Sequence, residues 1–231
     1  MTAAETLAPP APLAAPVIDT HTHLNLHDRY LHGDDVPDPD ALLALAAQAG
    51  VPKVVQIGCD VDYARHSIEL ARTRPSVAVG VSVHPNDAAR LEERSGRAAL
   101  DAALEEIAVL AADDVVRAVG ETGLDYFRTA EEWRKAQKHA FRFHIEIAKQ
   151  VGKTLVIHDR DSHEDVLETL ETAGAPERVV FHCFSGDDAM ARHCAERGWF
   201  LSFAGPITYK ANDSLREALS TVPDEIGRAH V

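Results

Sequence analysis

Short apolar runs alternate with helical patterns along this chain of 231 residues, and that order restricts its fold more than any other feature. Seven runs are short and rich in β-branched or aromatic residues, as buried strands are. They span residues 17–18, 54–57, 77–83, 115–119, 155–157, 179–181 and 200–203. Strands and helices in repeated alternation predict parallel strands joined by helical crossovers.

Helix signals fill the gaps between these runs. Asp38 is a typical capping residue before a proline, and Gly50 is a typical helix stop. Thr129 and Glu132 have the spacing of a capping box. The clearest predicted helices cover residues 38–50, 133–151, 161–173 and 187–197.

Polar residues at the ends of the predicted strands decide between a barrel and an open sheet. Nearly every run ends in His, Asp, Glu or Arg. Barrel enzymes place their chemistry at the carboxyl ends of many strands, whereas an open sheet concentrates it near one switch point. We therefore expect one α/β domain over residues 17–225, a TIM-type barrel of the (β/α)8 kind lacking its last strand and helix.

The first predicted strand ends with two histidines, His21 and His23. Alternate residues of a strand point the same way, so the two imidazoles project together. Such a pair makes half of a transition-metal site, although two ordinary polar histidines at a strand exit would give the same short pattern.

Three later strand ends add further metal-ligand types: Glu121, His158 and His182. A carboxylate leaving a strongly apolar strand must be paired or bind a cation, because burying it alone is costly. A salt bridge in the barrel mouth would also satisfy Glu121. Four strand-end histidines with one such carboxylate instead favour a divalent-metal centre holding two ions.

Charge and cysteine content limit the setting of the protein. The net charge of −14 argues against a broad basic face for nucleic acid, but bound cations can supply positive charge locally. An odd count of three cysteines without a Cys-x-x-Cys pair predicts a cytoplasmic location.

No apolar run approaches the roughly 20 residues of a membrane span. Residues 1–16, rich in Ala and Pro, predict a disordered leader.

Several motifs occur together in the order typical of one family, and the chain from about Val17 to about Pro223 resembles TatD deoxyribonucleases. The motifs are His21-Thr22-His23, Val83-His84-Pro85, Gly120-Glu121-Thr122-Gly123-Leu124-Asp125-Tyr126, His158-Asp159-Arg160 and His182-Cys183-Phe184-Ser185-Gly186. The third and the last of these are quite specific, and the set together is far stronger than any single motif.

The resemblance implies a metal-dependent hydrolase of the amidohydrolase kind that cleaves DNA phosphodiester bonds with a metal-activated water. It implies that His21 and His23 hold the first ion, that Glu121 bridges two ions, and that His158 and His182 complete the second site. The ions would be Mg, Mn or Zn. His84, Tyr126 and Arg160 match motif positions near the site and are expected as substrate contacts. DNA is the only partner implied, with no membrane and no stable protein partner.

The sequence departs from the family at its end. Family members continue into a strand that carries Glu-Thr-Asp, whose Asp is a ligand of the first ion. Here the sequence ends with Ile226-Gly227-Arg228-Ala229-His230-Val231, which resembles a translated sequencing adapter. We therefore expect residues 226–231 to be a foreign tail, and the resemblance does not establish that a chain ending there is active.

Other functions compete with the deoxyribonuclease. One is a different amidohydrolase-type enzyme, such as an aminoacyl-tRNA deacylase, an esterase or a lactonase, although many of those bridge their ions with a modified lysine. Another is an inactive truncated fragment. A Ser185–His182 nucleophile pair is disfavoured because no nucleophile elbow surrounds the serine. His27 and His32 fall in the first loop, where a substrate contact is also conceivable.

Overall fold

The computed structural model describes residues 11–24 and 38–229. Its strands form a single sheet in which each strand pairs in parallel with the next one along the chain. The strands are β1 (Ile18–Thr22), β2 (Lys53–Gly58), β3 (Val77–Val81), β4 (Val116–Asp125), β5 (Thr154–Arg160), β6 (Val179–Phe181), β7 (Phe200–Phe203) and β8 (Gly227–Ala229).

Helices connect successive strands. They are α1 (Pro39–Gln48), α2 (Val61–Arg72), α3 (Pro85–Ser95), α4 (Arg97–Ala111), α5 (Arg134–Val151), α6 (His163–Ala173), α7 (Asp188–Glu196) and α8 (Asp213–Thr221), with short 3-10 turns η2 (Glu131–Trp133) and η3 (Gly205–Thr208). The cap predicted at Asp38 is confirmed, because its side chain accepts from the backbone N–H of Asp40. The side chain of Asp187 caps α7 in the same way by accepting from the Met190 N–H.

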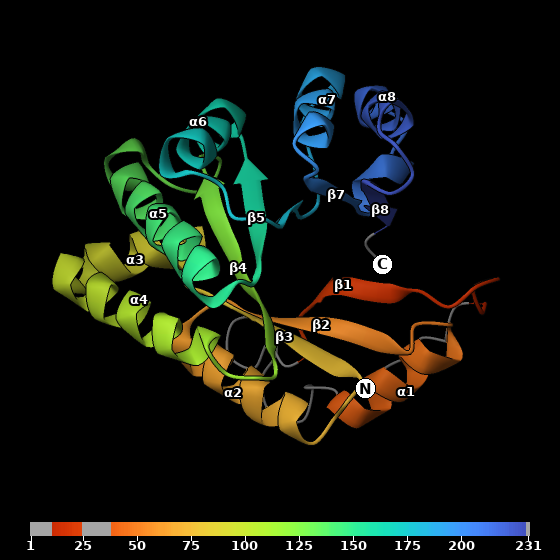
Figure 1. Ribbon diagram of the computed structural model, residues 1–231, viewed down its shortest axis with the longest axis horizontal. Coiled ribbons are helices and arrows are strands. Elements are labelled where there is room, and N and C mark those ends of the chain that lie inside the picture. The colour runs from red at the N-terminus through yellow and green to blue at the C-terminus, as the bar shows by residue number, and fades with distance from the viewer. Residues whose placement is uncertain (1–10, 25–37, 230–231) are drawn as a thin grey trace, which may run out of the picture.

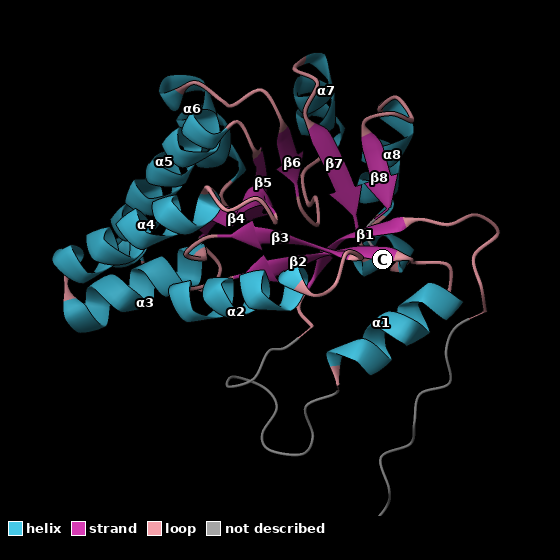
Figure 2. Ribbon diagram, turned by 60° about the horizontal axis from the view of Figure 1, so that its bottom comes forward, coloured by secondary structure: helices cyan, strands magenta, loops and turns pink. Residues whose placement is uncertain are grey.

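The sheet curls with its helices on the outer side, which confirms the TIM-type (β/α) fold (Figures 1 and 2). All seven predicted strands are present. Among the described residues, β1 and β8 form the two edges of the sheet and do not pair with each other. The carboxyl ends of the strands therefore share one face, although the barrel is not closed there.

One element differs from the expectation of a missing last strand. Residues Gly227–Ala229 pair with Leu201–Phe203 as β8, and the Leu201 N–H donates to the Ile226 carbonyl at 3.0 Å. Ile226 also packs, partly buried, against the core. Backbone pairing explains the strand, since the open edge of β7 offers N–H and C=O groups to any extended segment.

The core lies on both sides of the sheet. Strand residues such as Val79, Val119 and Ile157 are fully buried, as expected for parallel strands covered on both faces. Helix α5 places Phe141 and Ile145 on its buried face. This packing fixes the strands whose ends carry the candidate site.

The capping box predicted from Thr129 and Glu132 is wrong. Helix α5 begins at Arg134 after the turn η2, and no side chain caps it. The buried Thr129 hydroxyl instead donates to Asn86 Oδ1 at 2.9 Å and accepts from Gln137 Nε2 at 2.7 Å. The local spacing failed because partners distant in the sequence use the hydroxyl that would have formed the cap.

Two glycines allow β4 to approach β5 closely. Gly120 and Gly123 have φ values of 145° and 131°, a region that side chains disfavour. A Cβ at Gly123 would lie 2.1 Å from the carbonyl oxygen of His158, its register partner. The backbone of His158 can therefore occupy its position only because residue 123 on the neighbouring strand is a glycine.

Replacing Gly123 by Ala should displace His158 and destabilise the fold. The clash and the positive φ together should lower the free energy of unfolding by at least about 2 kcal/mol and weaken metal binding. Gly152→Ala is the matched control, because Gly152 has a φ of 64° and no atom within 4 Å of an added Cβ. The control should lose about 1 kcal/mol and keep its metal affinity. Equal effects of the two changes, measured by urea unfolding and metal titration, would contradict the argument.

Candidate metal centre

All five predicted metal-binding residues meet at the carboxyl face of the sheet. His21 lies on β1, Glu121 on β4 and His158 on β5, whereas His23 and His182 directly follow β1 and β6. Glu121 is 5% exposed and lies at the centre of the group. The convergence of four strand ends on one carboxylate is what a site built from strand ends requires.

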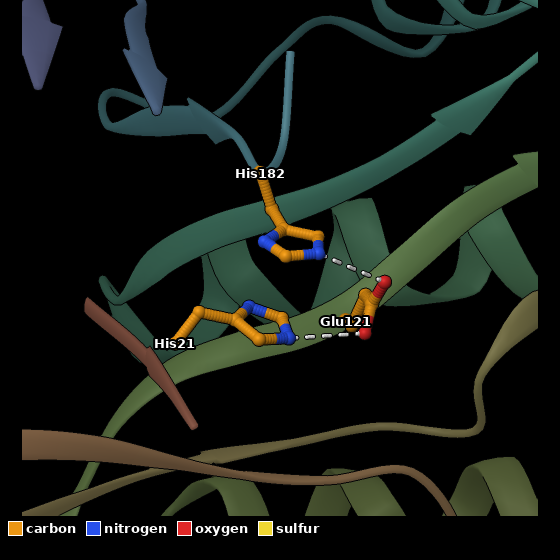
Figure 3. A group of neighbouring side chains, drawn as sticks. All are labelled: His21, Glu121 and His182. Atoms are coloured by element: carbon orange, nitrogen blue, oxygen red, sulfur yellow. Dashed lines mark ion pairs between the residues drawn. The ribbon is translucent and has the colours of Figure 1, made fainter. Parts of the chain in front are cut away.

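Three imidazoles surround the carboxylate of Glu121. His21 Nε2 is 3.2 Å from Oε2, and His182 Nε2 is 3.5 Å from Oε1 (Figure 3). His158 Nδ1 is 2.6 Å from the same Oε1. The rings of His21 and His182 stack with centroids 3.5 Å apart, so both direct a nitrogen toward the same carboxylate.

The donor set fits divalent metal ions. The side chains form three groups, and within each group the potential ligand atoms lie within 4.8 Å of one another. Every group contains Glu121, which is joined by His21 and His182 in the first, by His23 and Cys59 in the second, and by His84 and His158 in the third. Imidazole nitrogens and carboxylate oxygens suit Zn, and a carboxylate can serve two ions at once. In the structure His21 therefore shares a group with His182. From the sequence we instead expected His21 and His23 to hold the same ion.

Hydrogen bonds set the tautomers of two of these histidines. His23 Nδ1 lies 3.1 Å from the Ile57 carbonyl oxygen, which only accepts, so Nδ1 carries the proton and Nε2 keeps a lone pair for a ligand. His84 has the opposite arrangement, because its Nδ1 accepts from the Asn86 N–H at 3.1 Å. A neutral His84 therefore carries its proton on Nε2 and donates a hydrogen bond there, so in this tautomer the third group keeps Glu121 and His158 as its ligands.

The charge of Glu121 is maintained by its neighbours. Burial on its own would raise the pKa of the carboxyl, but His84, His158 and His21 outweigh it and hold that pKa well below its usual range. For the imidazole of His23, burial acts in the opposite direction and lowers the pKa, and the nearby His21 lowers it further. The site thus combines an ionised carboxylate with an imidazole kept neutral, and both are the forms that bind metals.

Asp125 orients His158 from the opposite side. His158 Nε2 is 3.2 Å from Asp125 Oδ2, which also accepts from Asn86 Nδ2 at 2.8 Å. Burial lowers the pKa of His158, but its contacts with Asp125 and Glu121 prevail and raise that pKa to about 9, so an ion bound by His158 has to displace a proton from the ring. Carboxylates that hold a ligating imidazole in place are a regular feature of metal sites.

Comparison with known proteins agrees with this geometry. The family model described as TatD related DNase matches residues 18–226. The chain belongs to the TatD-related DNase family. It is 38% identical over 213 residues to a protein of Mycobacterium tuberculosis named as an uncharacterized metal-dependent hydrolase TatD, covering 90% of this chain and 76% of that one.

Two other TatD proteins extend the comparison. A relative from Citrobacter rodentium, named 3'-5' ssDNA/RNA exonuclease TatD, is 31% identical over 192 residues, covering 82% of this chain and 70% of its own. The crystal structure of YJJV, a TatD homolog from Escherichia coli K12, superposes with a TM-score of 0.77 at 26% identity, covering 92% of this chain and 78% of that one. Family membership therefore rests on sequence and fold together.

The residues expected as substrate contacts occupy different environments in this TatD chain. His84 faces Glu121, with Nε2 3.7 Å from Oε1. Arg160 is half-buried at the end of β5. The Tyr126 hydroxyl donates to Asp165, and Arg134 covers the tyrosine ring, so this side chain is already engaged with the protein. His27 and His32 lie outside the described residues.

Sequence reasoning missed two residues of this centre. In the sequence Asp125 is only one residue of a longer motif, and Cys59 has no Cys-x-x-Cys partner to indicate a metal site. Cys59 directly follows β2, and its Sγ lies 4.0 Å from His23 Nδ1. The signal that could have found it is its position, because His23 and His182 also directly follow a strand. In the described part of the chain, no helix is both long and apolar enough to cross a membrane.

Proposed function

We propose that this chain, a metal-dependent hydrolase by family, cleaves phosphodiester bonds of DNA. The observation that carries the proposal is the buried Glu121 with the imidazoles of His21, His158 and His182 around it. A centre of this composition needs no Ser, Cys or Lys nucleophile. Ser185, the serine nearest such a role, donates its hydroxyl to the Asp159 carbonyl oxygen at 3.2 Å.

Two divalent ions, Mg, Mn or Zn, would be held by the five predicted ligands, with Glu121 shared between them. When bound, such ions polarise a phosphoryl oxygen and make a water acidic enough to attack near neutral pH. The protein itself contributes by holding the ligand side chains in place before the substrate binds. Asp125 and the Ile57 carbonyl do this by holding the rings of His158 and His23.

His84 and Arg160 would act on the substrate directly. The His84 Nε2–H faces the centre, so it can donate to a phosphate oxygen there. Arg160 adds a permanent positive charge at the same face. With a net charge of −14, the chain offers little long-range attraction to DNA, so local contacts of this kind must position the scissile phosphate.

The choice of DNA among possible substrates is supported by relatives such as the one named 3'-5' ssDNA/RNA exonuclease TatD. A substrate panel tests it: single-stranded DNA, double-stranded DNA, RNA, an aminoacyl-tRNA and a lactone, each incubated with the protein and Mg, Mn or Zn. We expect hydrolysis of DNA to exceed that of the ester and lactone substrates. Preferential release of the amino acid from tRNA, or lactone opening without DNA cleavage, would replace the proposal by the corresponding hydrolase.

A further inference from the structure

An exposed aromatic ring lies just beyond the metal centre. Phe127 is 62% exposed and follows β4 by two residues, whereas the preceding Asp125 is 1% exposed. Among the exposed large apolar side chains of the described residues, only Phe127 and Tyr209 are aromatic. Burial in the hydrophobic core therefore does not account for the position of the Phe127 ring.

The ring is held by a residue of the neighbouring strand. The guanidinium carbon of Arg160 lies over Phe127, 4.0 Å from the ring centroid. The strands are fixed to each other at this point, since Asp125 is the register partner of Arg160 and the Tyr126 N–H donates to the Arg160 carbonyl at 2.9 Å. Arg160 covers one face of the ring and leaves the rest of it to solvent.

This pair lies on the substrate side of the sheet. Arg160 is two residues after His158, so both side chains project to the same side of β5. Two residues of strand span about 7 Å, so the backbone of Arg160 lies about that far along β5 from the backbone of His158. A strand of nucleic acid whose phosphate lay at Glu121 would pass this pair with a neighbouring nucleotide.

We propose that Phe127 and Arg160 form a nucleobase-stacking subsite for a nucleotide flanking the scissile phosphate. The inference rests on the proposed function and deepens it, because it makes a single-stranded segment with an unpaired base the preferred substrate. The exposed ring stacks on the base, and Arg160 fixes the ring and faces the adjoining phosphate. Aromatic and arginine platforms of this type bind single strands with little sequence preference, since every base has a π-face.

Two oligonucleotides that differ only in the bases next to the cleaved end test the subsite. One is a fluorescein-labelled oligothymidylate, and the other carries abasic nucleotides in place of the bases next to the cleaved end. Binding is followed by fluorescence anisotropy in EDTA, and hydrolysis is followed with added Mn. The variants are Phe127→Ala and Phe127→Trp, and Val109→Ala on α4 is the control, because Val109 is apolar and 74% exposed away from the strand ends.

We expect Phe127→Ala to weaken binding of the oligothymidylate about 10-fold, the scale of losing one stacked base. In hydrolysis the loss should appear in KM and not in kcat, and the abasic strand should be bound equally by the variant and the original chain. Phe127→Trp should restore binding, and Val109→Ala should change nothing.

Equal binding of oligothymidylate by Phe127→Ala and the original chain would overturn the subsite, as would an equal loss for the abasic strand. Failure of the original chain to hydrolyse either strand would instead overturn the proposed function. The anisotropy comparison would then still decide whether Phe127 discriminates a base from an abasic nucleotide.

Discussion

Replacing Glu121 by Ala should lower the rate of DNA hydrolysis by at least about 100-fold, the scale of removing one strong electrostatic element from an active site. Glu121 is the one residue common to all three groups of potential ligands, and its oxygens lie 2.6 Å from His158 and 3.2 Å from His21. Without the carboxylate, the histidines lose both their shared anion and the bridge between ions. Metal content, measured by mass spectrometry of the purified protein, should fall with activity.

Glu92→Ala is the matched control for this change. Glu92 is also a buried carboxylate, 9% exposed, but it lies on α3 and pairs at 2.7 Å with Arg97, the first residue of α4. Its loss should cost some stability and leave metal content and turnover unchanged. Hydrolysis at the original rate in Glu121→Ala would show that Glu121 has a structural role only.

The second large effect is expected from single replacements of His21 and His158. These histidines belong to different ligand groups on opposite sides of Glu121. Each Ala variant should therefore retain about one ion where the original protein holds two, and each should lose about 100-fold or more in hydrolysis, since both ions contribute to the barrier. Isothermal titration of the metal-free proteins with Mn or Zn measures the stoichiometry.

His66→Ala controls for the loss of an imidazole far from the centre, because His66 is exposed on α2. It should keep the full stoichiometry. One ion in the original protein, or unchanged stoichiometry in both His21→Ala and His158→Ala, would contradict a two-ion centre.

The strands and the five candidate ligands at their ends could be predicted from the sequence because both depend on local patterns. A buried parallel strand is a short apolar run, and its carboxyl end is the next polar residue. His158 and His182 each follow such a run directly, so fold class and candidate site were predicted together. Their convergence on Glu121 then follows from the curled sheet.

Other features depend on contacts between distant segments, which a single sequence does not reveal. Thr129 has the spacing of a capping residue, yet Asn86 and Gln137 take its hydroxyl. Asp125 looks like one more polar strand end, and its role emerges only from its distance to His158. The strand β8 is set by the open edge of β7, whatever its side chains are.

Removal and return of metal tests the central claim most directly. The protein is stripped with EDTA, dialysed, and assayed on a single-stranded oligonucleotide before and after addition of Mg, Mn or Zn. We expect hydrolysis to fall to background in the stripped protein and to return with at least one ion as about two ions bind. Hydrolysis that persists in the stripped protein at its original rate, or that no ion restores while two ions bind, would contradict a metal-dependent phosphodiesterase built around Glu121.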